Sequence, residues 1–305
     1  MFFALFLLHT SLLADSVSAI NWDKVDKTEQ TLFYPGQSSW EWLLTKHDGA
    51  KSVRKGAPCL ECHEDEEKDM GKLIASGKKL EPSPIEGKPG SVNISVKSTY
   101  DDENVYFQLS WKDTGFSSGK EGKYKTKLTL MLGDAGVKEF PVAGCWGVCH
   151  DDATHMKSHK GDKKRQLYTS ASRLKIKRSG GGDNFVDKDV LDDLLNGKKF
   201  LEYLQLRVSA DNTQTAAHGY ILEKRIKHKK PKFTTKATLK DGIWTAYFLR
   251  KRAISGKGFL PINEKHTYTL GIALHEDFTK GRKHYVGFGK RFSLNGDTVI
   301  SASKQ

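Results

Sequence analysis

The four cysteines of this chain fall into two short motifs, and each motif ends in a histidine. The first reads Cys59-Leu60-Glu61-Cys62-His63, and the second reads Cys145-Trp146-Gly147-Val148-Cys149-His150. A cysteine pair followed directly by histidine is typical of c-type haem attachment, in which two thioethers hold the macrocycle and the adjacent imidazole binds the iron. Three intervening residues are a rarer spacing than two, but the second motif keeps the same Cys-His ending. The sequence therefore predicts two covalently bound haems c, with His63 and His150 as iron ligands.

Disulfides and a zinc site are the two alternative uses of these cysteines. Four cysteines are able to form two disulfides in an oxidising compartment. Zinc sites also use closely spaced cysteine pairs, but their histidine ligands usually follow after a separate loop. Two adjacent Cys-His dipeptides in a chain with four cysteines and 11 histidines favour haem over both alternatives.

The N-terminal residues have the pattern of an export signal. An apolar run from Phe2 to Leu8 is followed by the small-residue cleavage pattern Val17-Ser18-Ala19. We expect residues 1–19 to be a signal peptide whose removal leaves Ile20 first, and we expect the protein to act in a bacterial periplasm. The apolar run is too short to span a bilayer, and no other segment is apolar for long enough, so no membrane span is predicted after cleavage.

The chain is basic, with a net charge of +13 at pH 7. Residues 1–19 carry Asp15 and no Lys or Arg, so their removal changes the charge from +13 to +14. A basic surface is compatible with nucleic-acid binding, but export excludes that partner. Acidic redox proteins, such as an acidic cytochrome, are the expected partners, since opposite charges speed brief encounters. The alternative is that lysine-rich runs such as 227–230 are simply solvated loops.

Alternating apolar residues predict a mainly β structure from residue 91 onward. Val92, Ile94 and Val96 alternate with polar residues, and a second alternating run follows the turn at 101–104. Further strands are predicted at 124–132, 137–142, 174–177, 219–226, 233–239, 243–251, 267–274 and 285–294. Short strands separated by turns predict an antiparallel β-sandwich over residues 91–305, which carries the second motif.

Two regions depart from the strand pattern. Residues 20–90 are predicted to be an N-terminal haem-binding segment that carries the first motif, irregular up to residue 58 apart from short helical pieces. Residues 187–205 have apolar residues at helical spacing, interrupted at Asn196-Gly197, and predict a small helical insertion at about 186–205.

Several stretches resemble a known family. They are residues 93–113 (NISVKSTYDDENVYFQLSWKD), 143–152 (AGCWGVCHDD), 242–252 (GIWTAYFLRKR) and 268–289 (YTLGIALHEDFTKGRKHYVGFG). Together they resemble the cytochrome c-552 and dimethyl-sulfoxide-reductase-like haem-binding domain family, which includes the gamma subunit of ethylbenzene dehydrogenase. The resemblance implies an immunoglobulin-like β-sandwich with haem at one end and an electron-conducting role beside a molybdoenzyme subunit or a quinol-oxidising partner. The gamma-subunit branch holds a non-covalent b haem, and this chain departs from it because His63 and His150 belong to covalent motifs.

A sixth ligand decides the potential and the reactivity of each iron. His47 lies 12 residues before Cys59 and is a candidate for the first haem. His275, at the end of an apolar strand, and His284, across the next loop, are candidates for the second haem. His155 and Met156 follow the second motif too closely to reach over the same haem readily, and they would suit the first haem if the haems are neighbours.

Electron transfer without substrate turnover is the leading functional interpretation, as a periplasmic dihaem c-type cytochrome of a respiratory chain. The alternatives are a haem redox enzyme and a gas or ligand sensor, and both need one five-coordinate haem. Hydrolytic catalysis is not indicated, because the chain has no nucleophile motif and every cysteine belongs to a haem motif.

Overall fold

The computed structural model describes the chain from residue 17 to residue 305, except for residues 18, 82–83, 117–121, 150–167, 175, 178–179, 182–184, 280–282, 295 and 297. The strands of this described part are β1 Lys27–Phe33, β2 Ser91–Tyr100, β3 Asn104–Lys112, β4 Tyr124–Gly133, β5 Ile176–Lys177, β6 Gly180–Gly181, β7 Leu201–Ser209, β8 Gln214–Ile221, β9 Arg225–Lys227, β10 Phe233–Lys240, β11 Ile243–Lys251, β12 Tyr268–Glu276, β13 Tyr285–Val286, β14 Lys290–Ser293, β15 Ile300–Ser301 and β16 Ser303–Lys304. Its helices are η1 Trp22–Lys24, α2 Trp40–Thr45, α3 Ala50–Arg54, α4 Leu60–His63, α5 Glu67–Ala75, α6 Glu139–Ala143, α7 Cys145–Cys149, η3 Ser170–Ser172 and α8 Lys188–Asn196.

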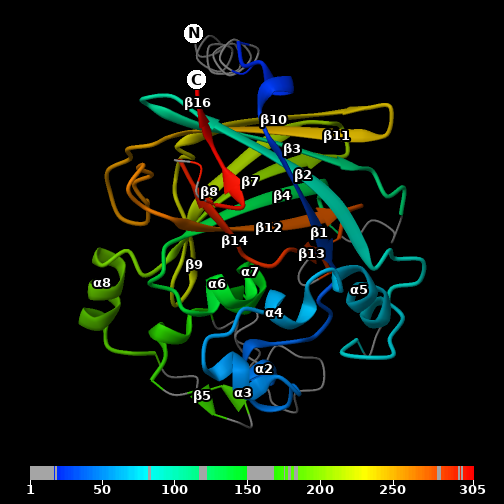
Figure 1. Ribbon diagram of the computed structural model, residues 1–305, viewed down its shortest axis with the longest axis vertical. Helices are drawn as coiled ribbons and strands as arrows, with labels where there is room; N and C mark the ends of the chain where they lie inside the picture. Colours follow the sequence, from blue (N-terminus) through cyan, green and yellow to red (C-terminus); the bar gives the residue numbers. More distant parts are fainter. Residues whose placement is uncertain are drawn as a thin grey trace.

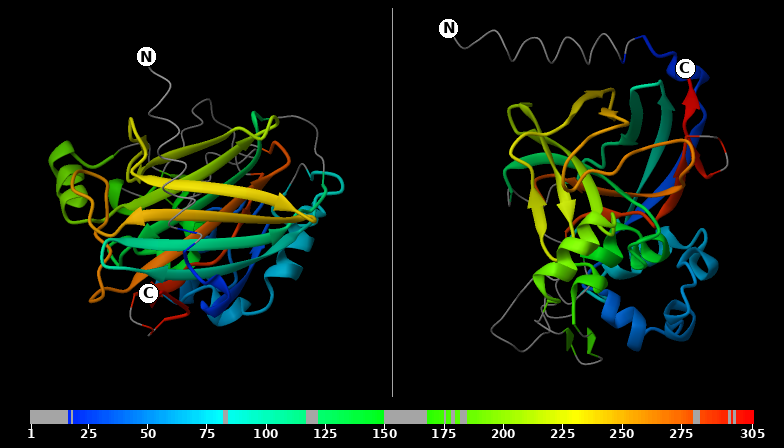
Figure 2. Two further views of the ribbon diagram at one scale, coloured as in Figure 1. Left: turned by 90° about the horizontal axis from the view of Figure 1, so that it is seen from above. Right: turned by 90° about the vertical axis from the view of Figure 1, so that its left-hand side faces the viewer.

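Fourteen of the described strands form one mainly antiparallel sheet. Its order is β10-β11-β3-β2-β1-β13-β12-β4-β7-β8-β9, with β14, β15 and β16 attached at the sides. The sheet curls so that β10 packs back against β7 and β8, and two layers face each other (Figures 1 and 2). The prediction of a mainly β chain built as an antiparallel β-sandwich is therefore confirmed.

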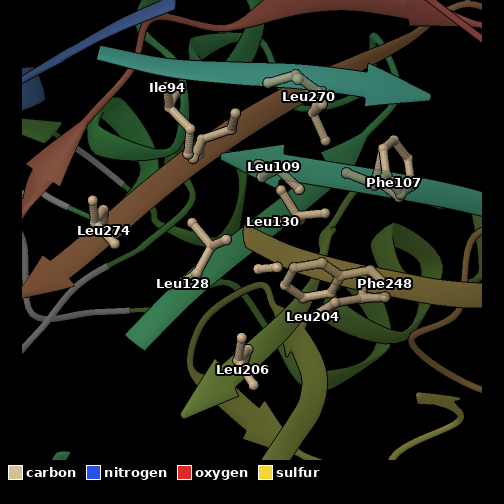
Figure 3. Packing of buried hydrophobic residues seen from close by; sticks show 14 of the residues in the cluster. Ile94, Phe107, Leu109, Leu128, Leu130, Leu204, Leu206, Phe248, Leu270 and Leu274 are labelled. Atoms are coloured by element: carbon tan, nitrogen blue, oxygen red, sulfur yellow. The ribbon is translucent and has the colours of Figure 1, made fainter. Parts of the chain in front are cut away.

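The main core lies between the two layers. Side chains from both layers point into this space, as Figure 3 shows, and they include Ile94, Phe107, Leu109, Leu128, Leu130, Leu204, Leu206, Phe248, Leu270 and Leu274. They come from alternate positions of each strand, because successive residues of a strand face opposite sides of a sheet. The other face of β12, β4 and β7 remains available for a second apolar layer.

That second layer is made by the helices. Helices α2 to α7 gather on one side of the sheet, in the lower half of Figure 1. A second apolar cluster lies there, and it joins Met131, Tyr203 and Ala273 of the strands to Trp40, Phe140, Val142 and Trp146 of the helices. All described cysteines except Cys62 belong to this cluster or pack against it. The described residues of both Cys-His motifs therefore lie on the outer face of the sheet and not in the main core.

The strand predicted at 137–142 is wrong, because these residues lead into helix α6. Pro141 has no N–H to donate to a strand ladder, whereas in the first turn of a helix the missing donor costs nothing. Phe140, Val142 and Ala143 are buried in the second cluster. Burial of this short helix beneath β12 explains the apolar pattern that suggested a strand.

The helical insertion predicted at about 186–205 is confirmed only in its first half. Helix α8 ends at Asn196 with Gly197 as its C-cap, as the Asn-Gly signal indicated. The second half is strand β7, which lies between β4 and β8. Leu201 and Tyr203 face the helices while Leu204 and Leu206 face the main core, so this strand is apolar on both faces. Such a pattern imitates helical spacing.

Smaller differences concern the N-terminal segment and some strand ends. Strand β1 was not expected, yet it pairs with β2 along its whole length and touches β13 through Phe33. Its polar residue Gln30 is buried and donates to the carbonyl of Phe288, 2.7 Å away. The strand predicted at 219–226 is divided between β8 and β9, and the one at 285–294 between β13 and β14.

A buried ion pair connects the two layers and gives a prediction for stability. Glu202 of β7 accepts from Arg250 of β11 (Nε 2.9 Å and Nη2 2.7 Å), and its Oε1 lies 2.7 Å from Nε2 of His218. All three side chains are fully buried. Burial raises the pKa of Glu202, but Arg250 and His218 outweigh burial and hold the pKa below its usual value.

We expect Glu202→Gln to lower the free energy of unfolding by about 3–5 kcal/mol, because it leaves the Arg250 charge buried without a carboxylate. Urea unfolding at pH 7 measures the loss. The matched control is Glu264→Gln, which removes the surface pair with Arg252 (3.0 Å) and should cost no more than about 1 kcal/mol. Equal losses for the two variants would contradict this assignment.

Candidate haem sites

The first motif forms a single helical turn. Cys59 precedes helix α4, and Cys62 and His63 end it. Positions three and four residues apart share one face of a helical turn, so the two thiols are presented to the same side. Cys59 is buried and Cys62 is exposed. Oε2 of Glu66 lies 2.8 Å from Nδ1 of His63, so the carboxylate fixes the ring proton on Nδ1 and leaves Nε2 as the nitrogen for a metal.

The ring of His47 lies close to the ring of His63. It follows helix α2, and the centres of the His47 and His63 rings are 5.8 Å apart with an angle of 59° between their planes. The centres of two imidazoles on opposite sides of a metal lie about 6 Å apart when each metal–nitrogen bond is about 2 Å. Burial, followed by the neighbouring His63, lowers the pKa of His47. The neutral ring, which is the form that ligates metals, is therefore favoured at pH 7.

The His47 ring also takes part in a local turn. The N–H of Gly49 donates to Nδ1 of His47 over 3.1 Å, and Trp42 packs against the ring edge with centroids 5.2 Å apart. With Nδ1 as acceptor, Nε2 carries the ring proton in this arrangement. A bond from Nε2 to iron would move that proton to Nδ1 and break the Gly49 hydrogen bond.

Residues Cys145 to Cys149 of the second motif form helix α7, which lies directly on strand β12. Gly144 turns the chain between α6 and α7 with φ 72°. A Cβ at Gly271 would lie 3.2 Å from Cβ of Cys145, so the absence of a side chain at Gly271 lets the helix approach the strand this closely. Cys145 and Cys149 are four residues apart on one helical turn. Because i,i+4 positions share a face as i,i+3 positions do, the extra residue still presents both thiols to one side.

The two motifs are neighbours in space although His63 and His150 are 87 residues apart in the sequence. The backbone N–H of Cys59 donates to the carbonyl of Val142 over 3.0 Å, three residues before Cys145. The indole N–H of Trp146 donates to Oγ of Ser38 over 3.0 Å, which ties the second motif to the segment just before helix α2. Trp40 and Trp146 are both buried in the shared apolar cluster. This places apolar walls beside the cysteines.

His275 and His284 lie together on the sheet face that carries Cys145. Ala273 pairs with Val286 across β12 and β13, and His275 follows Ala273 on the same face. The two rings stack with centroids 4.4 Å apart and 18° between their planes. This spacing leaves no room for a macrocycle between them, so in this arrangement they are not the two axial ligands of one iron. His150, His155 and Met156 lie outside the described residues.

A cluster of cations on the same face was not predicted from the sequence. Lys127 of β4 pairs in register with His275 on one side and with Arg207 of β7 on the other. Oε1 of Gln205 accepts from Nε of Arg207 (2.7 Å) and from Nη2 of Arg225 (3.4 Å). Burial, together with Arg207 and Arg225, lowers the pKa of Lys127 to about 8. The signal in the sequence was the pair of polar residues Gln205 and Arg207, which stand two residues apart and alternate with Leu204, Leu206 and Val208 in strand β7.

The thiols of Cys59, Cys145 and Cys149 are not activated for nucleophilic chemistry. Burial raises the pKa of Cys59 to about 12 and the pKa of Cys149 to about 11, and it also raises the pKa of Cys145. A catalytic thiolate needs a lowered pKa. All four cysteines are unpaired, and the described residues contain no cluster of three or more His, Cys, Asp or Glu arranged to hold a metal ion. Two thiols on each helical turn, apolar walls beside them, and a His63 ring whose proton is held on Nδ1 fit haem instead.

The described residues include no helix that is both long enough and apolar enough to cross a membrane.

Comparison with known proteins relates the whole chain to haem proteins. The ethylbenzene dehydrogenase family profile matches residues 19–287. Cytochrome c-552 of Stutzerimonas stutzeri is 33% identical over 298 residues, which cover 96% of this chain and 93% of that protein. Cytochrome c-551 of Rhodocyclus tenuis is 28% identical over 293 residues, which cover 94% of this chain and all of that protein.

Solved structures give a weaker likeness. A family 9 carbohydrate-binding module from Caldicellulosiruptor kristjanssonii in complex with glucose is 13% identical, with 65% of this chain and 66% of that chain covered and a TM-score of 0.30. By the match over residues 19–287 and the relatives that span nearly its whole length, this chain belongs to the ethylbenzene dehydrogenase family.

Proposed function

We propose that this protein is a dihaem c-type cytochrome that carries single electrons between redox partners. The observation that carries the proposal is the hydrogen bond from the N–H of Cys59 to the carbonyl of Val142, which joins the two Cys-His motifs within one apolar cluster. Two haems attached at these cysteines would be neighbours, and neighbouring haems exchange electrons directly, without a conformational change. The names of the two cytochrome relatives support covalent haem c as the cofactor.

The first haem would be held by thioethers to Cys59 and Cys62 and ligated by His63 and His47. The Glu66 contact leaves Nε2 of His63 for the iron, and the position of His47 supports a bis-histidine site. Two imidazole ligands give a lower potential than a His/Met pair and leave no open position for a substrate. This arrangement favours electron transfer over turnover at the first iron.

The second haem would be held by Cys145 and Cys149 with His150 as its first ligand. His275 and His284 are the described candidates for its second ligand, because both lie on the face of β12 and β13 next to helix α7. His155 and Met156 remain candidates from the sequence. The apolar cluster around Cys145, with Trp146, would pack beside this haem, and dry apolar surroundings raise the potential by disfavouring the charged ferric state.

The surroundings of the protein follow from its sequence. An export signal over residues 1–19 would bring the chain to the periplasm, where covalent haem is attached in bacteria. The strongly basic composition favours acidic electron donors and acceptors, which long-range attraction would guide into brief encounters. An acidic cytochrome, a quinol-oxidising protein and a molybdoenzyme subunit are the partner classes to test in a respiratory chain.

Haem content and spin state test the proposal together. The chain would be expressed with its signal in a bacterium that matures c-type haems, and the purified protein would be examined by pyridine haemochrome assay and low-temperature EPR. We expect two covalent haems per chain and only low-spin ferric signals. One haem or none would overturn the dihaem assignment. A high-spin signal that shifts with cyanide or nitric oxide would point to a redox enzyme or a gas sensor.

A further inference from the structure

We propose that Lys127, Arg207 and Arg225 form a clamp for the two propionates of the second haem, with Gln205 as the residue that positions the guanidiniums. The inference rests on the proposed attachment of a haem at Cys145 and Cys149 and deepens it, since it names the groups that bind the opposite edge of that haem.

Gln205 holds the guanidinium groups of Arg207 and Arg225 in place. The carboxamide of Gln205 is buried, with 4% exposure, and its Nε2 donates to Oγ1 of Thr129 over 2.8 Å. This bond fixes the orientation of the amide, so that Oε1 accepts from both Arg207 and Arg225. Arg225 also lies over the ring of Tyr203, 4.4 Å from its centre. The guanidiniums are therefore oriented by neighbours that carry no negative charge.

The three cations lack an acidic partner among the described residues. Among the described residues, no Asp or Glu forms an ion pair with Lys127, Arg207 or Arg225, although Glu202, Glu264 and Asp192 do pair with other cations. Three like charges gathered on the outer face of β4, β7 and β9 repel one another. Lys127 and Arg207 are only partly exposed. An anion seated among them would remove this repulsion, and bidentate guanidinium–carboxylate bonds are among the strongest that it could form.

The cations lie on the same sheet face as helix α7, about one haem length from Cys145. Cys145 lies against Gly271, and Lys127 pairs with His275, four residues further along β12. Four residues of strand span about 13 Å, which is of the order of one haem. Arg225 lies over the ring of Tyr203, which belongs to the apolar cluster that contains Cys145 and packs against Cys149. The vinyl groups of haem react with the cysteines, and the propionates lie on the opposite edge of the macrocycle. A haem attached at helix α7 and lying along this face would therefore direct its propionates toward the cations.

The test compares the double variant K127Q/R225Q with the control double variant K236Q/K240Q. The control removes the same charge from exposed positions on β10, in the opposite layer of the sandwich. Both are made in the full chain and titrated by spectroelectrochemistry at about 0.15 M salt, where distant surface charges are largely screened. Pyridine haemochrome assay first checks that each protein still carries the wild-type number of haems.

We expect only one of the two redox waves to shift in K127Q/R225Q. Removing positive charge beside a haem favours the ferric state, so the ferric to ferrous ratio of that haem at a fixed potential should rise roughly tenfold, or about 59 mV for one electron. Its potential should also start to fall with rising pH near neutrality, because propionates without cationic partners bind protons more readily. The propionate bending bands in the resonance Raman spectrum should shift as well. The control should change neither wave.

Two unshifted waves in K127Q/R225Q, or equal shifts in that variant and the control, would overturn the clamp while leaving the dihaem proposal intact. A wild-type protein with fewer than two haems would overturn the proposed function itself, and the clamp with it. A role of these residues in folding alone would lower stability without moving a potential, and that outcome also counts against the clamp.

Discussion

Replacing Cys145 and Cys149 with alanine is expected to lower the covalent haem content from two per chain to one. Haem c is retained through denaturation only by its thioether bonds, and each motif supplies its own pair. Helix α7 should still form in this variant, because Phe140, Trp146 and Val148 pack beneath β12 independently of the thiols. The content is measured by haem staining after denaturing electrophoresis and by intact mass, which register covalent haem alone.

The reciprocal variant C59A/C62A is the matched control for this result. It should also retain one haem, and its remaining absorption and redox wave should be those that C145A/C149A loses. Two haems in C145A/C149A would show that the second motif does not attach haem. No haem in either variant would indicate that the two attachments depend on each other, which the separate thiol pairs do not predict.

Replacing His47 with alanine is expected to convert one of the two haems from low spin to high spin. His47 lies 5.8 Å from His63, ring centre to ring centre, so its loss would leave the first iron without a sixth protein ligand. The midpoint potential of that haem should rise by on the order of 100 mV, because an imidazole stabilises the ferric state and axial ligands tune haem over about 0.8 V. EPR and redox titration measure the two effects.

Three controls make the His47 result specific. Added imidazole should return H47A to low spin, and His47→Met should stay low spin at a higher potential, since a His/Met pair raises it. His266→Ala removes an exposed histidine and should leave both haems unchanged. If H47A kept two low-spin haems at their original potentials, His47 would not be a ligand, and His155 or Met156 would become the candidates for the first iron.

The sandwich could be predicted wherever alternation was clean. Strand β11 begins and ends at the predicted residues, Ile243 and Lys251, and its alternate residues Trp244, Ala246, Phe248 and Arg250 are buried while those between them are partly exposed. Prediction from alternation was wrong at β7, where both faces of the strand are buried, and at α6, where the apolar residues of a buried helical turn resemble a strand. The same method missed β1, which has a mixed polar sequence and is held in the sheet by its pairing with β2.

The candidate haem sites were also predictable from the sequence only in part. The sequence by itself predicts the covalent haem chemistry, because each motif acts through local geometry: one helical turn presents both of its thiols to the same side, whatever surrounds it. Only the tertiary structure decided which other residues lie beside these helical turns. The approach of His47 to His63, the hydrogen bond that joins Cys59 to Val142, and the gathering of Lys127, Arg207 and Arg225 around Gln205 all depend on which elements pack together and in what register. Register between distant strands is set by the burial of many side chains at once, so no short stretch of sequence carries it.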